Sequence, residues 1–283
     1  MRIIEKNNQI LLQGVSFFDL GRTLDCGQCF RWNLCSDGFW EGVAAGHFCR
    51  VRQERTVLIF THTDRQCIRE FWIPYFGLDE DYDALCRHFS SDPVLCRAVR
   101  FAPGIRLLRQ DPWETLCSFI FSQNNNIPRI RGIIERFCCL FGNPLENSPP
   151  SFPTPERLAL CTTEDLAPLR SGFRAKYLLD AAQKVSSGAV DLKSVVHMDA
   201  DSARRVLTGI CGVGPKVADC VLLYGFHRTE VVPMDVWMKR VLSTLYPDGF
   251  PQPFAPYMGI AQQYLFHYAR CHAADFRQPT GQV

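Results

Sequence analysis

The sequence predicts an α+β protein, in which an N-terminal antiparallel sheet precedes a mostly helical body. Up to about residue 62, short apolar runs alternate with turn residues, a pattern typical of strands. Beyond that point, longer segments carry apolar residues at helical spacing and begin at capping residues. We expect residues 1–100 to hold the sheet and the helices after it, and residues 101–283 to form the helical domain.

Composition and charge limit the classes of protein to consider. With 283 residues, 47% of them hydrophobic, the chain can form one large or two modest domains. The formal net charge is only +2, so a surface for nucleic acid must be a local patch. The N-terminal segment MRIIEKNNQI lacks the apolar core of a secretory signal, and no apolar run approaches the about 18 residues of a membrane span. We expect an intracellular protein, in the cytoplasm or nucleoid if bacterial, with reduced thiols and no membrane partner.

The strands are expected in a regular succession. Two apolar runs flank Lys6-Asn7-Asn8, which predicts a first hairpin. Ser36-Asp37-Gly38 is a favourable turn for a second hairpin. Further strands are expected at residues 30–34, 39–43, 48–51 and 57–60. Successive hairpins of this kind predict an antiparallel sheet.

Helical character begins near residue 64. The aromatic segment DRQCIREFWIPYFG is expected to pack the sheet onto the helical body, and Asp92-Pro93 opens another helix. Asp111, Pro112 and Glu114 predict a helix start with an N-cap, a first-turn proline and a capping box.

Two loops interrupt the helical part of the chain. Three consecutive asparagines, residues 124–126, predict a loop, which Pro128 is expected to stiffen. The Pro- and Ser-rich residues 143–155 predict a surface loop. The last helix is expected from about Phe254 to Arg270.

The segment 207–241 predicts helix, tight turn, helix, loop and helix. Gly212 and Gly214 bracket Val213, and a proline occupies the first turn of the next helix. A helix that begins at a glycine hairpin offers free N–H groups and a positive dipole end, which bind phosphate without reading sequence. These three residues are therefore candidate contacts to a nucleic-acid backbone, although an ordinary connection between helices fits the pattern as well.

Lys216 and Asp235 make this hairpin unusual. Lys216 lies in the first helical turn, where the dipole favours the neutral amine that a nucleophile needs. Asp235 precedes an apolar-periodic helix and suits an N-cap. A lysine near a carboxylate fits attack on a sugar carbon with imine formation, whereas a phosphate contact or a solvated lysine is the alternative.

The segments GVGPKVADC and VVPMDV resemble the helix-hairpin-helix glycosylase superfamily, and within it the 8-oxoguanine DNA glycosylases. GQCFRW and AQQYLF extend the resemblance over nearly the whole chain. The resemblance implies a bifunctional repair enzyme that flips out and excises 8-oxoguanine opposite cytosine. It implies that Lys216 attacks C1′ and forms a Schiff base, that Asp235 stabilises the positive sugar, and that β-elimination nicks the strand.

The resemblance also assigns the base-recognition residues. It implies that the carbonyl of Gly27 accepts from N7–H, a donor that guanine lacks. It places Gln262 at the Watson–Crick edge, Phe266 against one face of the base and Cys220 against the other. From the residues alone, Gln262 and Phe266 share a helical face. A Phe266 in the core and a Gln262 at its rim fit this spacing as well as base contacts do. Cys220 alone fits plain packing.

On the opposite strand, the resemblance assigns Asn124 and Arg129 to the orphaned cytosine. It makes Phe173 the apolar wedge, where the family often has Tyr, and gives Arg174 a second contact to the cytosine. From the residues alone, these positions fit a capped turn and helix-start packing. Trp237 stands where the family commonly has a His that contacts phosphate.

No cofactor is expected. Among fourteen cysteines, the CxxC at Cys26–Cys29 has no second CxxC to complete a zinc ribbon. The four clustered cysteines of related endonuclease III-type enzymes are missing, which implies no iron–sulfur cluster. The carbonyls of Thr208, Ile210 and Val213 could hold a monovalent or divalent structural cation.

The expected partner is double-stranded DNA with 8-oxoguanine paired to cytosine, bound by a monomer. Glycosylases for other lesions and non-catalytic hairpin proteins are the alternatives.

Overall fold

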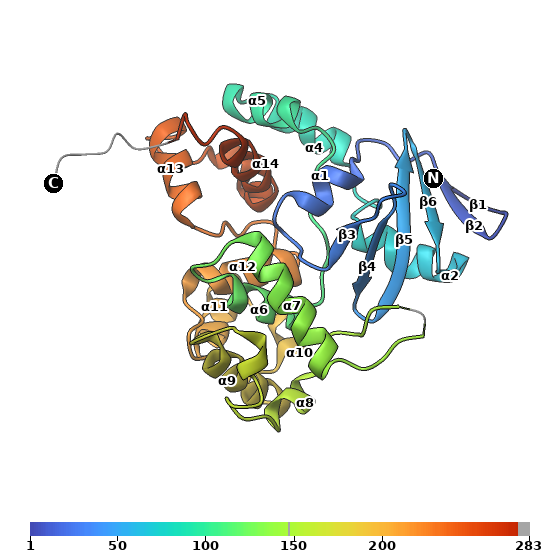
Figure 1. Ribbon diagram of the computed structural model, residues 1–283. Helices are drawn as coiled ribbons and strands as arrows, with labels where there is room; N and C mark the ends of the chain where they lie inside the picture. Colours follow the sequence, from blue (N-terminus) through green and yellow to red (C-terminus); the bar gives the residue numbers. More distant parts are fainter. Residues whose placement is uncertain (147, 277–283) are drawn as a thin grey trace.

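A six-stranded antiparallel sheet stands beside a larger helical body in the computed structural model, which describes residues 1–146 and 148–276 (Figure 1). The order of the strands is β1-β2-β6-β5-β4-β3. Their bounds are β1 Arg2–Lys6, β2 Gln9–Gln13, β3 Trp32–Leu34, β4 Trp40–Ala44, β5 His47–Glu54 and β6 Val57–Thr61. The predicted N-terminal sheet is confirmed.

The first hairpin shows why the sequence forms it. Asn7 and Asn8 have φ values of 51° and 58°, and Lys6 pairs with Gln9 across the turn. Two consecutive residues of positive φ match the twist of the flanking strands, and asparagine tolerates this conformation better than most residues. The turn therefore fixes the register of β1 against β2.

The remaining elements are helical, and most of them come after the sheet in the chain. Those up to residue 101 are α1 (Leu20–Asp25), α2 (Arg65–Cys67), the π-helix η1 (Ile68–Trp72), α3 (Ile73–Tyr75), α4 (Tyr82–Phe89) and α5 (Pro93–Phe101). Then come α6 (Pro112–Ser122), α7 (Ile127–Phe141), α8 (Pro155–Ala159), η2 (Ala167–Leu169), α9 (Arg174–Ser186), α10 (Leu192–Val195), α11 (Ala200–Thr208), α12 (Pro215–Gly225), α13 (Val236–Leu245), η3 (Gln252–Tyr257) and α14 (Met258–Cys271). The expected helical domain extends to residue 283, of which 277–283 lie outside the described residues.

The helix starts predicted at Asp92 and Asp111 are confirmed, with two corrections nearby. Asp92 and Asp111 cap α5 and α6 through their side-chain oxygens. Glu114 does not complete a capping box, because its carboxylate faces Arg31 at 3.6 Å. Pro128 lies in the first turn of α7 rather than in the asparagine loop.

Two buried apolar clusters organise the chain. One lies between the sheet and the helices η1 and α3, around Trp32, Phe60 and Trp72. The other fills the helical body and includes Tyr82 and Phe89 of α4 together with residues of α5 to α14. Helices α4 and α5 thus share the core of the helical body, although nearly all of their residues lie in the expected N-terminal domain, 1–100. No helix in the described part of the chain is long and apolar enough to cross a membrane.

Candidate active site

The predicted hairpin joins α11 to α12 through a tight turn. Gly212 has φ +75°, and a Cβ there would lie 2.3 Å from the ring of Tyr177, so only glycine fits. The N–H of Val213 donates to the carbonyl of Ile210 at 3.0 Å. Gly214 is exposed and caps α12 without a side chain, which leaves the first N–H groups of the helix open to an anion.

Two side chains of helix α9 hold this hairpin by hydrogen bonds to its backbone. Asp180 Oδ2 accepts from the N–H of Cys211 at 2.6 Å and from Lys184 Nζ at 2.9 Å. Lys184 also donates to the carbonyl of Gly209 at 2.7 Å. The carbonyls predicted to hold a cation, those of Thr208, Ile210 and Val213, lie in the same turn, and the cation itself stays a prediction. Within the described residues, no cluster of three or more His, Cys, Asp or Glu side chains could hold a metal ion.

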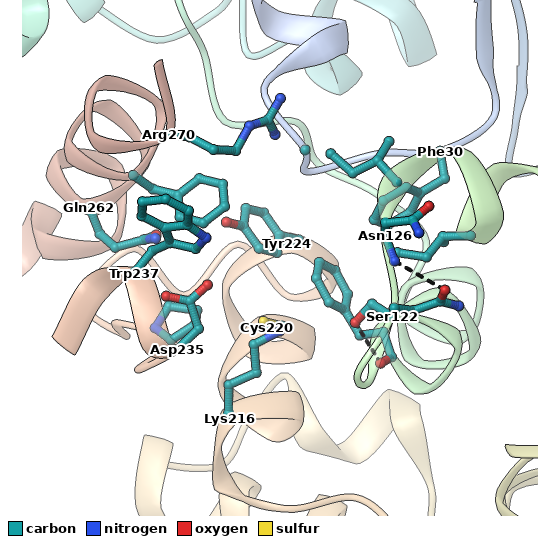
Figure 2. A pocket seen from close by; sticks show the side chains of 17 residues that line it. Phe30, Ser122, Asn126, Lys216, Cys220, Tyr224, Asp235, Trp237, Gln262 and Arg270 are labelled. Atoms are coloured by element: carbon teal, nitrogen blue, oxygen red, sulfur yellow. Dashed lines mark hydrogen bonds between the residues drawn. The ribbon is translucent and has the colours of Figure 1, made fainter. Parts of the chain in front are cut away.

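A cavity of about 380 Å³ opens beside the hairpin (Figure 2). It collects side chains from segments far apart in the sequence: the stretch before β3, the α6–α7 region, α12, the start of α13, and α14. All six residues predicted for chemistry and base recognition line it, namely Gly27, Lys216, Cys220, Asp235, Gln262 and Phe266. A volume of this size lies in the range of small-molecule sites.

Lys216 and Asp235 reach the cavity from two helix starts (Figure 2). Lys216 is half-buried in the first turn of α12, and its Nζ lies 5.3 Å from the centroid of the Phe119 ring. Asp235 caps α13 as predicted, with Oδ1 accepting from the N–H of Met238 at 2.8 Å. The two side chains line one cavity, and among the described residues no ion pair joins them. A nucleophile and a carboxylate are therefore both available to one substrate group.

Gly27 offers a free acceptor at the cavity wall. The carbonyls on either side of it are occupied, since that of Cys26 accepts from Gln263 and that of Gln28 from Gln110. No described residue donates to the carbonyl of Gly27. Its φ of +92° favours glycine, and a Cβ would meet Arg270 Nη1 at 3.0 Å.

Gln28 holds this segment in place, a role that the sequence did not reveal. Its Nε2 donates to the carbonyls of Thr23 and Arg106 at 2.9 and 2.8 Å. Its Oε1 accepts from the N–H of Leu108 at 2.9 Å. The side chain is buried, so these bonds fix the backbone on which Gly27 lies.

Gln262 carries an unpaired acceptor. Its side chain is only 3% exposed, and its Oε1 has no hydrogen-bond partner among the described residues. A buried acceptor without a donor costs free energy unless a ligand supplies the donor. Phe266 lies one helical turn further along α14 and lines the same cavity.

Cys220 is a neutral wall of the cavity. Burial raises the pKa of its thiol to about 11, and the charge of Lys216 beside it opposes the shift only in part. A thiol with this pKa stays protonated near neutral pH, so it is not a thiolate nucleophile.

Three of the four residues predicted for the opposite strand lie outside the cavity on exposed surface. Asn124 has φ +45° and is exposed in the loop after α6, and Arg129 is exposed in the first turn of α7. The ring of Phe173, just before α9, is 51% exposed. An exposed aromatic side chain of this size suits insertion between bases.

Arg174 differs from the other three residues predicted for the opposite strand. Its guanidinium is buried and donates to the carbonyls of Gln123, Asn124 and Ser171. In the DNA-free protein, Arg174 therefore holds the asparagine loop, and a direct contact to cytosine requires some of these bonds to break.

Arg270 and Trp237 also line the cavity, and the sequence did not assign them to it. The position of Arg270, two turns after Gln262 on α14, was the available signal. Trp237 was noted only because it stands where the family commonly has a His that contacts phosphate. Its place on the cavity wall results from the packing of α13, which no local pattern reveals.

Known families and structures match this geometry. Residues 10–116 match the family model of the 8-oxoguanine DNA glycosylase N-terminal domain, and residues 117–250 match that of the HhH-GPD superfamily of base excision DNA repair proteins. The N-glycosylase/DNA lyase of Saccharomyces cerevisiae is 34% identical over 80% of this chain and 68% of its own.

Two solved structures each align with a TM-score of 0.91 over 96% of this chain and 99% of theirs. One is MBOgg1 in complex with a low-affinity DNA ligand, which is 42% identical. The other, 34% identical, is the Clostridium acetobutylicum 8-oxoguanine glycosylase/lyase in complex with double-stranded DNA containing cytosine opposite 8-oxoG. The chain therefore belongs to the 8-oxoguanine DNA glycosylase family of the helix-hairpin-helix superfamily, and it is a DNA N-glycosylase with DNA lyase activity.

Proposed function

We propose that the protein excises 8-oxoguanine paired with cytosine through a Schiff base on Lys216 and then nicks the strand by β-elimination. The observation that carries this proposal is the single cavity in which Lys216 and Asp235 meet Gly27, Gln262 and Phe266. A nucleophile, a carboxylate and two unpaired acceptors then surround one bound base. Since the cavity lies outside any duplex, the base must leave the stack to reach it.

Hydrogen-bond complementarity supports the choice of base. 8-Oxoguanine carries a donor at N7, and guanine carries an acceptor there. The free carbonyl of Gly27 satisfies the donor and repels the acceptor. The unpaired Oε1 of Gln262 accepts from the N–H groups of the Watson–Crick edge. A site whose buried acceptors stay unpaired rejects the wrong base more strongly than an apolar pocket does.

The proposed reaction divides the work between Lys216 and Asp235. The neutral amine attacks C1′ while the N9–C1′ bond breaks and its electron pair leaves with the base. The negative charge of Asp235 stabilises the positive charge that develops on the sugar. Opening of the sugar ring converts the adduct to an imine. Loss of a C2′ proton then expels the 3′ phosphate, and hydrolysis of the imine frees Lys216.

The surface around the cavity supports cytosine as the partner base. Asn124 and Arg129 are exposed side chains that can read base edges, and Phe173 is exposed as the wedge. The hairpin at Gly212, Val213 and Gly214 leads into α12, whose first backbone N–H groups are open to a phosphate, while the N–H of Val213 is bonded within the turn. The net charge of +2 leaves DNA binding to such local contacts.

Excision from defined duplexes tests this function. We expect release of 8-oxoguanine opposite cytosine to be faster than opposite the other three bases. Release of alkylated adenine or of an oxidised pyrimidine should be slower still. Equal or faster release of one of those lesions would show that the cavity serves another base.

Asp235→Asn should slow release of the base far more than it weakens binding of the duplex. A pure loss of affinity would contradict the role of Asp235.

A further inference from the structure

Three side chains lie on one face of α14 and line the cavity: Gln262, Phe266 and Arg270. Their spacing of four residues brings each about 6 Å further along the helix axis than the one before. A base that stacks on Phe266 and presents one edge to Gln262 therefore has its other end near Arg270.

Arg270 has a donor without an acceptor. Its Nη1 is shielded from solvent and has no hydrogen-bond partner among the described residues. A guanidinium keeps its charge at any physiological pH, so an unpaired buried N–H here is costly unless a ligand accepts from it. Figure 2 shows the guanidinium at the rim of the cavity, at the opposite end from Lys216.

This donor lies beside a free acceptor. The Nη1 of Arg270 is 3.0 Å from the point where a Cβ on Gly27 would lie. The carbonyl of Gly27 accepts no hydrogen bond from the described residues. One end of the cavity thus offers an acceptor and a charged donor next to each other.

The imidazole edge of 8-oxoguanine has the complementary order, with the N7–H donor next to the C8 carbonyl acceptor. Guanine offers an N7 acceptor and a C8–H at the same places. We propose that Arg270 is a specificity-determining residue, which donates from Nη1 to the C8 carbonyl oxygen while Gly27 accepts from N7–H. The orientation of the base in this inference rests on the proposed function of Gly27 and Gln262.

The contact also assists bond cleavage. When the N9–C1′ bond breaks, its electron pair stays with the base and spreads onto the C8 oxygen. A guanidinium at that oxygen stabilises the leaving base more than the bound base. Loss of Arg270 should therefore slow single-turnover excision by a larger factor than it weakens binding.

Binding to two duplexes tests the assignment. Arg270→Gln is compared with its parent in a Lys216→Gln background, which prevents turnover. One duplex carries 8-oxoguanine opposite cytosine, and the other carries a tetrahydrofuran abasic analogue, which has no base. We expect Arg270→Gln to weaken binding of the first about tenfold or more and of the second by less than about twofold. Arg100→Gln, on the exposed side of α5, is the matched loss of charge and should change neither.

Each other outcome overturns the assignment. Equal losses on both duplexes would show that Arg270 binds the DNA backbone, and a loss on neither would show that it does not touch the base. The DNA-free Arg270→Gln protein should unfold at no lower temperature than its parent, because Arg270 makes no hydrogen bond to the described residues. A large fall would assign Arg270 a structural role. If the parent binds the 8-oxoguanine duplex no more tightly than a third, otherwise identical duplex with guanine opposite cytosine, the proposed function fails instead.

Discussion

Gly27 combines three properties that no other residue provides at this position. Its backbone has φ +92°, it leaves room for Arg270 and Phe266, and its carbonyl is free while its neighbours' carbonyls are bonded. A side chain would strain the backbone and enter the space that we assign to the base. The chemistry at this residue therefore depends on backbone geometry.

Gly27→Ala should lower kcat/KM for 8-oxoguanine excision by at least about a hundredfold, since both the backbone and the cavity must shift. The measurement is excision under single-turnover conditions. Binding to an abasic duplex is the control, and it should be nearly unchanged because the hairpin and wedge are intact. An alanine variant that excises at the parental rate would remove Gly27 from base recognition.

The unpaired side chain of Gln262 lowers the stability of the free protein and serves base recognition. Its buried Oε1 has no donor among the described residues, so Gln262→Leu should leave the free energy of unfolding unchanged or raise it by about 1 kcal/mol. The same change should slow excision of 8-oxoguanine, because the N–H groups of the Watson–Crick edge lose their acceptor. Gln263→Leu is the matched control, because Gln263 bonds to Tyr224 and Cys26 and its loss should destabilise the fold. Denaturant unfolding compares the two, and a destabilised Gln262→Leu would show that Gln262 serves packing.

The asparagine loop between α6 and α7 is the element on which opposite-base reading depends. Asn126 caps α7 by accepting from the N–H of Arg129, and Asn125 donates to the carbonyl of Phe121 at 3.0 Å. Arg174 holds the carbonyls of Gln123 and Asn124 from the start of α9. The loop is thus tied at both ends while Asn124 stays exposed.

Arg174→Met should lower the free energy of unfolding by about 2 kcal/mol, because it leaves the partly buried carbonyls of Gln123 and Asn124 without a charged donor. Arg129→Met, an exposed neighbour, should leave stability unchanged and reduce discrimination against bases other than cytosine. Denaturant unfolding and excision opposite each base measure the two effects. A fully stable Arg174→Met protein would refute the holding role.

The contact between Arg31 and Glu114 joins the segment before β3 to α6. Both side chains are largely buried, Arg31 also donates to the carbonyl of Pro150 at 2.6 Å, and burial raises the pKa of Glu114 to about 7. In the unfolded chain the pKa of this carboxyl returns to its ordinary value of 4.5. The native state therefore binds more protons between these two values, and stability falls as pH rises through them.

The free energy of unfolding of the wild-type protein should fall by up to about 3 kcal/mol as pH rises from 4.5 to 7, because of this group. Below pH 4.5 the full contribution of Glu114 to stability is present. Glu114→Gln cannot titrate, so the difference in unfolding free energy between the two proteins should vary over this interval. Chemical denaturation at several pH values measures it. Parallel curves for the two proteins would show that Glu114 titrates normally.

At the scale of the whole molecule, the site lies where all the major parts of the chain meet. The stretch before β3 supplies Gly27, α12 supplies Lys216, and α14 supplies Gln262. Because helices α4 and α5 share a core with α14, the C-terminal helix is held by segments that lie early in the chain. The cavity therefore forms only when the complete tertiary fold is in place.

Local signals explain what could be predicted from the sequence. The turn at Asn7 and Asn8 and the caps at Asp111 and Asp235 depend on a few adjacent residues, and all were predicted. Six of the residues that line the cavity were predicted through motif resemblance. The burial of Arg174 and the unpaired Nη1 of Arg270 depend on partners from distant segments, so no local pattern could show them.

The central claim is that the amine of Lys216 forms a covalent bond to the sugar of the lesion nucleotide. Borohydride reduction during turnover on a duplex with 8-oxoguanine opposite cytosine measures this bond, because it converts the imine to a stable cross-link. The wild-type protein should become covalently attached to DNA, and Lys216→Gln, which still binds the duplex, should not. Cross-linking of Lys216→Gln at the wild-type level would contradict the account.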